Sequence, residues 1–379
     1  MKLILVHISP IIKYPPALTV LQYLSELGID LTLCTTDIDE VTAGICEKYR
    51  INVINIEANY NKTIPPLLKL VRMRRIRKEA WKAIDNIYDS DSVIWVFSDL
   101  ALKHLGKRLL NRRFILQMFE LSEKTIYYRK FPMLSLNTKK YAKRSLCVIQ
   151  SEYNRAHIAK SWWELDNLPF VLPNKPYIKK RLSKKLPISS QVAAEIIHSL
   201  EGKKIILYQG IISPERPLDK IIKAVNMLGE DYAFVIMSSG KDIYKNIGSD
   251  NYYFIPFISP PYHLEVTSHA YIGVLSYQPS HNEYSKLNAL YCAPNKIYEY
   301  SMFGIPMIGN DVPGLSYVFE RNKCGFCFKE FEETFIINAI KKIESNYEFM
   351  GAQAKVFYNE TDIKEKIQEV INFTSNMIE

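Results

Sequence analysis

One segment of this chain combines charged, polar and small residues at a spacing that suits a phosphorylated ligand. Residues 294–315 read Pro-Asn-Lys-Ile-Tyr-Glu-Tyr-Ser-Met-Phe-Gly-Ile-Pro-Met-Ile-Gly-Asn-Asp-Val-Pro-Gly-Leu. Pro294 suits the first turn of a helix, and Gly304 suits the left-handed residue that ends one. The exposed N–H groups at such a helix start favour an anion, and Lys296 adds a full positive charge there.

A carboxylate follows one turn later. Asn295 and Glu299 lie four residues apart and therefore share one face of the predicted helix. A glutamate in this position can accept hydrogen bonds from two hydroxyls, such as the 2′ and 3′ hydroxyls of a ribose. The alternative interpretation is an ordinary amphipathic helix with a surface glutamate, and the combined pattern favours a nucleotide site.

Residues 294–306 resemble, nearly throughout, the donor-nucleotide motif of GT-B glycosyltransferases. The resemblance is to the large retaining family, glycosyl transferases group 1, that builds bacterial surface polysaccharides. The family pattern is a Pro-Asn-Lys-(aliphatic)-(aromatic)-Glu-Tyr helix, a Gly-(aliphatic)-Pro break, a strand and an Asp/Gly-rich turn. The resemblance implies that Glu299 binds the ribose, while Asn295 and Lys296 lie near the sugar and the diphosphate.

Two features beside the motif concern the donor sugar. Many family members carry a second glutamate eight positions before the first, and that position is Tyr291 here. The run Cys292-Ala293-Pro294 is similar to a subgroup with Cys-x-Pro-Asn-Lys in this stretch. The resemblance therefore says more about how the nucleotide is held than about how the sugar is held.

Length and composition exclude several classes of protein. A chain of 379 residues suggests two domains, and 47% hydrophobic with 12% aromatic residues is typical of large cores. A net charge of +9 favours a polyanion, an anionic membrane surface or phosphate substrates without choosing among them. The six cysteines are expected to be reduced thiols of a cytoplasmic protein. The apolar runs are too short for a signal peptide or a membrane span.

Short apolar runs alternate with helical patterns twice along the chain, as in βα units on a parallel sheet. The runs are 2–9, 30–36, 51–57, 92–98, 113–120, 145–151 and 168–173, then 203–210, 232–238, 251–257, 270–277, 305–309 and 324–328. We therefore expect an α/β protein. The GT-B resemblance implies two Rossmann-like, doubly wound domains facing a cleft, with ligands at the carboxyl ends of the strands.

The domain boundaries follow from composition. We expect an acceptor-binding domain at 1–174, a polar, basic and proline-bounded linker at 174–190, and a donor-binding domain at 190–360. The last segment, about 361–379, has helical apolar spacing. The resemblance implies that this helix crosses back onto the first domain.

The turn after the strand at 203–210 supplies further candidate donor contacts. Gly210 lets the backbone pass close to a ligand, and Arg216 can aim a planar fork at a diphosphate. The resemblance implies that Arg216 and Lys296 are the two cations on the diphosphate. The alternative for Arg216 is a solvated charge before a helix that starts at Pro217.

Two more turns complete the candidate donor site. Ser238, Ser239 and Gly240 follow a strand and are expected to line its floor, unless they form a plain turn. Residues 254–258 match the family loop whose backbone usually meets the base, so Phe257 is assigned to the site. Main-chain contacts leave no side-chain signature, and a UDP-sugar is the default donor.

The first half should hold the acceptor and part of the reaction centre. No Gly-rich nucleotide loop follows its first strand. Glu120 is expected to end the strand at 113–120 at the cleft rim, where the family often places a polar contact to donor sugar or acceptor. His7 could be the general base of an inverting enzyme, but a satisfied core histidine is the favoured interpretation.

The candidate catalytic residues are Glu120, Arg216 and Lys296. A retaining front-side mechanism needs no protein nucleophile. The leaving diphosphate can take the acceptor proton while fixed cations stabilise its developing charge.

A basic stretch at 67–82 is a separate candidate surface. Its core is Arg72, Arg74, Arg75, Arg77 and Lys78, with apolar residues interleaved. A basic amphipathic helix is typical of a membrane-surface element. The resemblance places this stretch on the acceptor side, near a lipid-diphosphate acceptor, and the alternative is a solvated helix face.

Metal and cofactor motifs are weak. Asp89-Ser90-Asp91 matches the Asp-x-Asp of metal-dependent transferases but precedes its strand, at the wrong end for a ligand. Cys324 and Cys327 form a single Cys-x-x-Cys without two further ligands at matching spacing. We expect no metal and no cofactor, since the nucleotide-sugar is a substrate.

The sequence therefore predicts a metal-independent, retaining glycosyltransferase. Its expected acceptor is a hydroxyl of an oligosaccharide linked to a polyprenyl diphosphate, used in the cytoplasm or at the inner face of the membrane. One alternative is a sugar-nucleotide epimerase, which would need acid/base carboxylates or histidines along the cleft. Another is a non-catalytic, nucleotide-sugar-binding subunit. A nucleic-acid binder is disfavoured because no recognition motif is present.

Overall fold

The computed structural model describes residues 1–58, 65–128, 131–179, 182–280 and 285–378. The chain divides into two compact units. Unit 1 consists of Met1–Tyr177, Glu283–Ser285 and Asp362–Glu379, and unit 2 consists of Ile178–Asn282 and Lys286–Thr361. The division falls inside the polar stretch 174–190.

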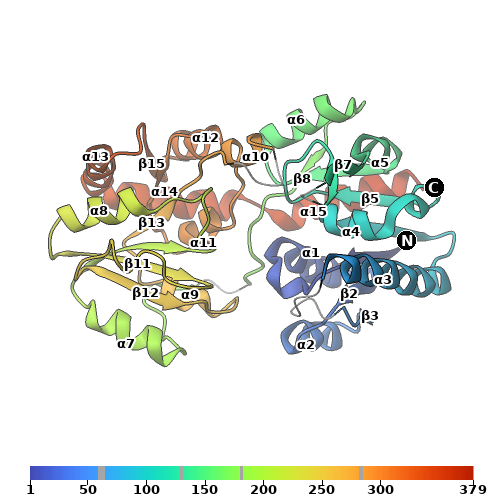
Figure 1. The fold of residues 1–379 in the computed structure, drawn as a ribbon, viewed down its shortest axis with the longest axis horizontal. Coiled ribbons are helices and arrows are strands. Elements are labelled where there is room, and N and C mark those ends of the chain that lie inside the picture. The colour runs from blue at the N-terminus through green and yellow to red at the C-terminus, as the bar shows by residue number, and fades with distance from the viewer. Residues whose placement is uncertain (59–64, 129–130, 180–181, 281–284, 379) are drawn as a thin grey trace. The chain divides into compact units, whose positions relative to one another are not determined.

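Unit 1 is built on a seven-stranded parallel sheet with the order β3-β2-β1-β4-β5-β8-β9 (Figure 1). The strands are β1 Lys2–His7, β2 Asp30–Thr36, β3 Asn52–Ile56, β4 Ser92–Phe97, β5 Phe114–Gln117, β8 Cys147–Gln150 and β9 Phe170–Val171. The strand order reverses at β1, which lies between β2 and β4. The carboxyl ends of these strands therefore form a switch point, where such sheets bind ligands.

Helices cover both faces of this sheet. They are α1 Pro15–Glu26, α2 Glu40–Lys48, α3 Pro66–Ile87, α4 Ser98–Leu105, α5 Thr138–Arg144, α6 Tyr153–Trp163 and α15 Ile363–Asn376. Alternate residues of β1 point to opposite faces, so Leu3 and Leu5 pack with α1 and α15, while Ile4 and Val6 pack with α3, α4 and α6. Residues near the end of the sequence thus complete the core of the first unit.

A pair of antiparallel strands, β6 Thr125–Tyr128 and β7 Phe131–Leu136, was not predicted from the sequence. Strand β5 also ends at Gln117, so Glu120 lies in the loop beyond it instead of ending the strand. In the sequence, the short buried strand and the irregular turn after it form one apolar run. Hydrophobic periodicity alone therefore does not show where the strand ends.

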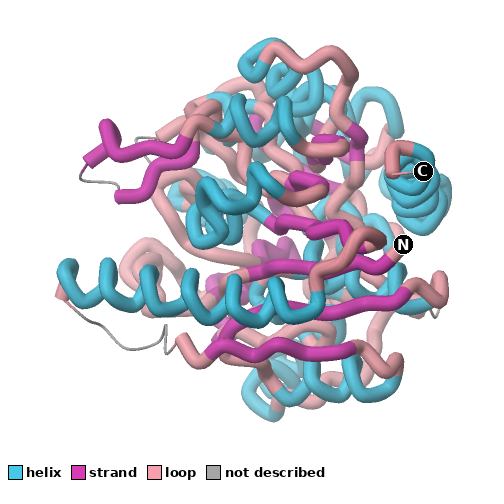
Figure 2. Tube along the Cα trace, turned by 90° about the vertical axis from the view of Figure 1, so that its right-hand side faces the viewer, coloured by secondary structure: helices cyan, strands magenta, loops and turns pink. Residues whose placement is uncertain are grey.

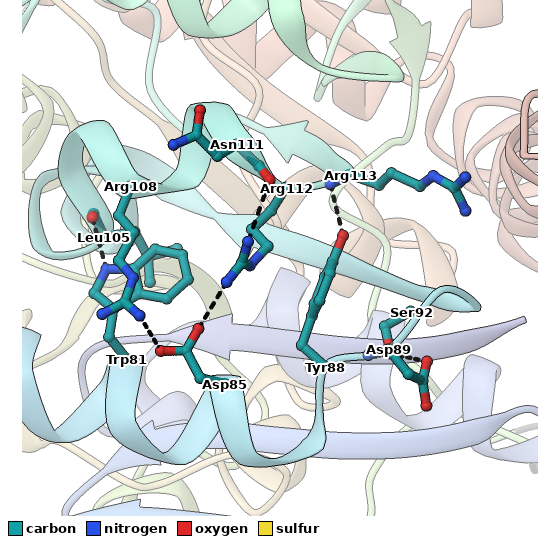
Figure 3. A network of polar contacts seen from close by, with 10 residues as sticks. All are labelled: Trp81, Asp85, Tyr88, Asp89, Ser92, Leu105, Arg108, Asn111, Arg112 and Arg113. Carbon is teal, nitrogen blue, oxygen red and sulfur yellow. Dashed lines mark hydrogen bonds and ion pairs between the residues drawn. The ribbon is translucent and has the colours of Figure 1, made fainter.

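A polar network holds the second half of α3 against the rest of unit 1 (Figure 3). The indole N–H of Trp81 donates to the Leu105 carbonyl at 2.8 Å. Asp85 accepts hydrogen bonds from Arg108 and, at 2.9 Å, from Arg112. These contacts tie α3 to the last residue of α4, to the 3₁₀ helix Gly106–Asn111 and to Arg112, which follows that helix.

Unit 2 is built on a six-stranded parallel sheet with the order β12-β11-β10-β13-β14-β15. The strands are β10 Lys204–Gln209, β11 Tyr232–Ser238, β12 Tyr252–Pro256, β13 Ile272–Leu275, β14 Met307–Asn310 and β15 Gly325–Phe328. Each strand overlaps a run predicted from the sequence. Its reversal point lies at β10 and β13, so the carboxyl ends of these two strands mark the expected ligand position.

The helices of unit 2 also pack on both faces of the sheet. They are α7 Gln191–Ser199, α8 Asp219–Met227, α9 His263–Thr267, α10 Leu287–Leu290, α11 Lys296–Met302, α12 Pro313–Asn322, α13 Glu333–Glu344 and α14 Tyr347–Glu360. Helix α11 packs closely because β13 carries Gly273, where a Cβ would lie 2.4 Å from the Tyr300 ring. Tyr300 in turn donates to the Leu207 carbonyl at 2.9 Å, which fixes α11 against the centre of the sheet.

Across the described ranges, no helix is both long enough and apolar enough to cross a membrane.

Candidate functional site

The predicted motif helix is α11, and it begins at Lys296, two residues later than predicted. Asn295 is its N-cap residue, although its side chain makes no capping hydrogen bond. Gly304 ends the segment with φ of 64°. A Cβ there would lie 2.9 Å from the Gly351 carbonyl oxygen, so the residue must be glycine for α11 and α14 to meet.

Glu299 is buried, with 6% of its surface exposed, and both of its carboxylate oxygens are held in place. The Gln209 amide donates to Oε2 at 2.5 Å, and His263 Nε2 lies 3.3 Å from Oε1. The Thr267 hydroxyl donates to Gln209 Oε1 at 2.6 Å, which fixes the orientation of the amide. Gln209 ends β10 and the other two come from α9, so three elements converge on this carboxylate.

Glu299 is held in its charged form. Burial alone raises the pKa of this carboxyl group, but His263, Gln209 and Lys296 act in the opposite direction and the net result is a lowered pKa. An ionised carboxylate is acceptor-only, and each oxygen can accept more than one hydrogen bond. It can therefore bind two neighbouring hydroxyls in addition to its protein partners.

Lys296 lies in an aromatic setting beside this carboxylate. Its Nζ is 4.5 Å from the centre of the Tyr208 ring and 5.7 Å from that of Tyr277. The Arg216 guanidinium lies 5.4 Å from the same Tyr277 ring centre. The predicted pair of cations is thus brought together around one aromatic side chain, as cation–π contacts allow.

Gly210 makes room for Lys296. Its φ is 128°, and a Cβ at this position would lie 3.0 Å from Lys296 Nζ. The Gly210 N–H donates to the Met237 carbonyl at 3.0 Å, which joins the end of β10 to the end of β11. The glycine therefore serves both the turn and the approach of the lysine.

The positive charge on Lys296 is unfavourable in the ligand-free protein. Burial and the neighbouring Arg216 hold the pKa of Lys296 well below its usual value, although Glu299 acts in the opposite direction. A bound diphosphate would supply the missing negative charge and raise this pKa again. The site is therefore electrostatically prepared for an anion.

We predict that UDP binding takes up protons at pH values near the lowered pKa of Lys296. The diphosphate favours the protonated amine, so affinity should rise as pH falls from the higher pKa of Lys296 in the complex to its lowered pKa in the free protein, and should level off below that. Calorimetric titration of UDP in buffers of different ionisation enthalpy measures this uptake directly. Uptake should disappear in Lys296→Met, and an equal uptake in that variant would contradict the assignment.

The remaining predicted donor residues also follow strand ends of unit 2. Ser238 ends β11 and is buried, with its hydroxyl donating to the Ser239 carbonyl at 3.3 Å. Ser239 and Gly240 come next and are exposed, with φ of 95° at Gly240. Phe257 directly follows β12 and is exposed. These residues lie at the same carboxyl edge as Gly210, and their contact with a ligand stays a prediction.

Two predictions concern residues of the first half of the chain, Glu120 and His7. Glu120 belongs to unit 1, whereas Arg216 and Lys296 belong to unit 2, so its catalytic role stays a prediction. His7 is fully buried, as expected of a core residue, but neither ring nitrogen has a hydrogen-bond partner among the residues that the structure describes. Its ring lies edge-on to Tyr14 with centroids 4.4 Å apart. Burial lowers the pKa of His7 to about 3, so its ring is neutral. The favoured interpretation was right about the core position and wrong about the hydrogen bonds.

The residues of the basic stretch differ in their exposure and contacts. Arg77 donates at 2.7 Å to the carbonyls of both Lys103 and His104, at the end of α4. Free carbonyls at a helix end attract such a cation, so Arg77 supports the fold and does not belong to an exposed patch. Arg72 is half-buried, whereas Arg74, Arg75 and Lys78 are exposed.

The metal-like motifs have structural explanations. Asp89 accepts a hydrogen bond from the Ser92 hydroxyl at 2.6 Å (Figure 3). It also accepts one from the Asp91 N–H at 3.1 Å, and the two contacts form the turn before β4. Burial raises the pKa of the Cys324 thiol to about 12, and both it and Cys327 are free thiols. Among the residues with described positions, no group of His, Cys, Asp and Glu is arranged to hold a metal ion.

The two doubly wound parallel sheets give this chain the GT-B fold, which confirms the predicted fold class. Residues 192–361, which contain Gln209, Arg216, His263, Lys296 and Glu299, match the family model of glycosyl transferases group 1. Together these findings support a glycosyltransferase. No match is found among curated protein sequences.

Solved structures of similar fold extend over nearly the whole chain. The Anabaena protein HepE in complex with UDP-glucose has a TM-score of 0.68 at 12% identity, covering 99% of this chain and 100% of that one. Sucrose-phosphate synthase from Thermosynechococcus elongatus has 0.62 at 14%, covering 100% and 97%. A putative UDP-N-acetylglucosamine 2-epimerase from Listeria monocytogenes has 0.58 at 12%, covering 98% and 94%. At these identities the likeness shows the fold alone.

Proposed function

We propose that this protein transfers a sugar from a nucleotide-sugar donor bound at the carboxyl edge of the unit 2 sheet. The observation that carries the proposal is a buried, ionised Glu299 in the same helix as Lys296, whose amine and the Arg216 guanidinium lie against the same Tyr277 ring. A carboxylate for a ribose diol and two cations for a diphosphate are the complementary groups of a nucleoside diphosphate.

The proposed roles follow from the contacts. Gln209 and His263 each occupy one acceptor direction of the Glu299 carboxylate, and a second direction on each oxygen remains for a ribose hydroxyl. Lys296 and Arg216 stabilise the negative charge that develops on the leaving diphosphate. Asn295, at the start of α11, is assigned to the sugar side of the diphosphate.

The donor nucleotide, the acceptor and the stereochemistry of the reaction are part of the same proposal. We infer a UDP-sugar donor, and the HepE structures with UDP and with UDP-glucose support this choice. The proposed acceptor is a hydroxyl of a lipid-linked oligosaccharide in bacterial surface polysaccharide synthesis. The reaction proceeds with retention, without metal or cofactor, in the cytoplasm, and Glu120 supplies a polar contact to sugar or acceptor.

A ligand panel tests the donor assignment. Stabilisation by a ligand follows RT ln(1 + [L]/Kd), so a true donor at 100 times its Kd adds about 2.7 kcal/mol to the free energy of unfolding. UDP, GDP, ADP, dTDP and their common sugars should give one base-selective thermal shift. If no nucleotide shifts the unfolding temperature, even with acceptor lipid extract present, the transferase proposal fails and the non-catalytic subunit gains support.

The epimerase alternative is favoured by one finding, the fold likeness to the Listeria protein. An epimerase converts its nucleotide-sugar without any acceptor and leaves the nucleotide attached. A transferase instead releases free nucleoside diphosphate in proportion to the sugar transferred. Chromatography of the nucleotide products, with and without acceptor lipid, separates the two reactions.

We predict that His263 is a positioning residue for Glu299. In His263→Ala the carboxylate loses one of its partners, so UDP should bind about 10- to 150-fold more weakly, as expected for a lost hydrogen bond to a charged group. The transfer rate at saturating donor should change much less. His263→Gln keeps a donor near Oε1 and should recover most of the affinity, whereas equal weakening in both variants would reject this role.

A further inference from the structure

Helix α3 of unit 1 contributes to the core through its second half. Among the α3 side chains with described positions, those in the hydrophobic core begin at Ile76 and continue with Ala80, Trp81 and Ile84. The polar anchors Trp81 and Asp85 belong to the same half (Figure 3). The earlier turns, 66–75, therefore extend past the part of the helix that the core holds.

The opposite side of α3 combines cations with exposed apolar side chains. We call it the basic face of α3, and it consists of Leu68, Val71, Arg74, Arg75, Lys78 and Lys82, all of them exposed. Their spacing of three and four residues places them on one side of the helix. Leu68 is 52% exposed and Val71 is 60% exposed, and within the described part of α3 Glu79 is the one exposed acid.

A second element projects on the same side of unit 1. Figure 2 shows the first turns of α3 and the β6–β7 hairpin extending together beyond the sheet. The sequences of β6 and β7 are Thr-Ile-Tyr-Tyr and Phe-Pro-Met-Leu-Ser-Leu, which are rich in aromatic and apolar residues. On this side of the unit, the exposed apolar residues whose positions are described are Leu68 and Val71, and they share the basic face of α3 with its cations.

We propose that the basic face of α3 docks unit 1 on an anionic lipid bilayer. Leu68 and Val71 enter the headgroup region, while Arg74, Lys78 and Lys82 lie over the anionic headgroups. An interfacial helix binds through this combination of apolar area and positive charge. A soluble polyanion such as nucleic acid would engage the cations but would give the two exposed apolar residues no role, so the bilayer is the better match.

The proposal goes beyond the donor site and does not depend on it, because the surface belongs to unit 1 and the donor residues to unit 2. Near an anionic bilayer each cation strengthens binding roughly fivefold. The contribution of the cations to vesicle binding should fall as salt is added, because salt screens exposed charges. Removal of the apolar pair should weaken binding at every salt concentration.

Co-sedimentation of the full chain with vesicles tests the proposal, using phosphatidylcholine alone and phosphatidylcholine mixed with phosphatidylglycerol. The apolar variant is Leu68→Gln with Val71→Gln. Its matched control is Val192→Gln with Met227→Gln, two helical apolar residues of similar exposure, 51% and 65%. The charge variant is Arg74→Glu, Lys78→Glu and Lys82→Glu, and its control changes three exposed lysines elsewhere, Lys223, Lys329 and Lys364, to Glu.

The wild type should bind the mixed vesicles, and both α3 variants should bind them about tenfold more weakly or worse. Both controls should bind as the wild type does, and circular dichroism should show every variant folded. Wild-type failure to bind mixed vesicles, or equal losses in the controls, would overturn the proposal. Vesicle binding unchanged in the apolar variant, together with tight binding of the wild type to duplex DNA, would identify a general polyanion surface instead. UDP titration of the same variants keeps this outcome separate from any failure of the donor assignment.

Discussion

Glu299→Ala should bind UDP about 30- to 1000-fold more weakly than the wild type, the loss expected when one member of a buried, hydrogen-bonded charged contact is removed. The carboxylate is buried and ionised, and Glu299 is the one acidic residue of α11, whose residues are all described. Isothermal titration with UDP measures the change.

The same substitution should also lower the stability of the ligand-free protein. The Gln209 amide loses the acceptor at 2.5 Å, and a buried polar group without a partner costs about 1–3 kcal/mol. Glu299→Gln keeps the size of the side chain and removes its charge, so it should weaken UDP binding with a smaller loss of stability. Glu365→Ala, at an exposed site on α15, is the matched control and should change neither quantity. Wild-type UDP affinity in a folded Glu299→Ala protein would remove the proposed nucleotide site from α11.

Lys296→Met should abolish most of the transferase activity and at the same time stabilise the protein. A fixed cation at a developing negative charge contributes about 10²- to 10³-fold to a reaction rate. The lysine is only 8% exposed, and its charged form is disfavoured there. Methionine has a similar length and no charge, so we expect a gain of about 1–2 kcal/mol in the free energy of unfolding.

The pH dependence of stability gives an independent readout for this variant. The pKa of Lys296 is lower in the folded protein than in the unfolded chain, so the unfolded chain binds more protons between the two values. Wild-type stability should therefore gain a rising contribution with pH in that window, and Lys296→Met should lack it. Lys223→Met, at an exposed site on α8, should behave as the wild type in both activity and stability. Loss of stability in Lys296→Met, with activity retained, would show that the lysine is structural.

Much of the fold could be predicted because its signals are local. The strands of both sheets overlap predicted apolar runs, since a buried parallel strand reads as a short run of aliphatic residues wherever it occurs. Gly304 and Gly28 end helices α11 and α1 with φ of 64° and 69°, the conformations that favour glycine. The hairpin β6–β7 escaped because its apolar residues follow no clear alternation and include a proline.

The chemistry of the site was predictable where one short segment carries it. Lys296 and Glu299 lie within one turn of α11, so their proximity follows from helix geometry alone. Arg216 was assigned through its turn after β10, and the structure brings it to the same aromatic ring as Lys296.

The partners of Glu299 were decided by tertiary structure. Gln209 precedes it by 90 residues in the chain, and His263 comes from a separate short helix. Nothing in the local pattern of either residue indicates a carboxylate partner, because the contact depends on how α9, α11 and β10 meet at one sheet edge. The same holds for Arg77, whose hydrogen bonds to the end of α4 take it out of the predicted exposed surface.

The sequence by itself thus determined the helices, the strands and the reactive side chains that they carry. It did so through hydrophobic periodicity and through capping and turn preferences, which act over a few residues. Which side chains are buried, paired or presented to a ligand was settled only when distant strand ends came together and excluded water.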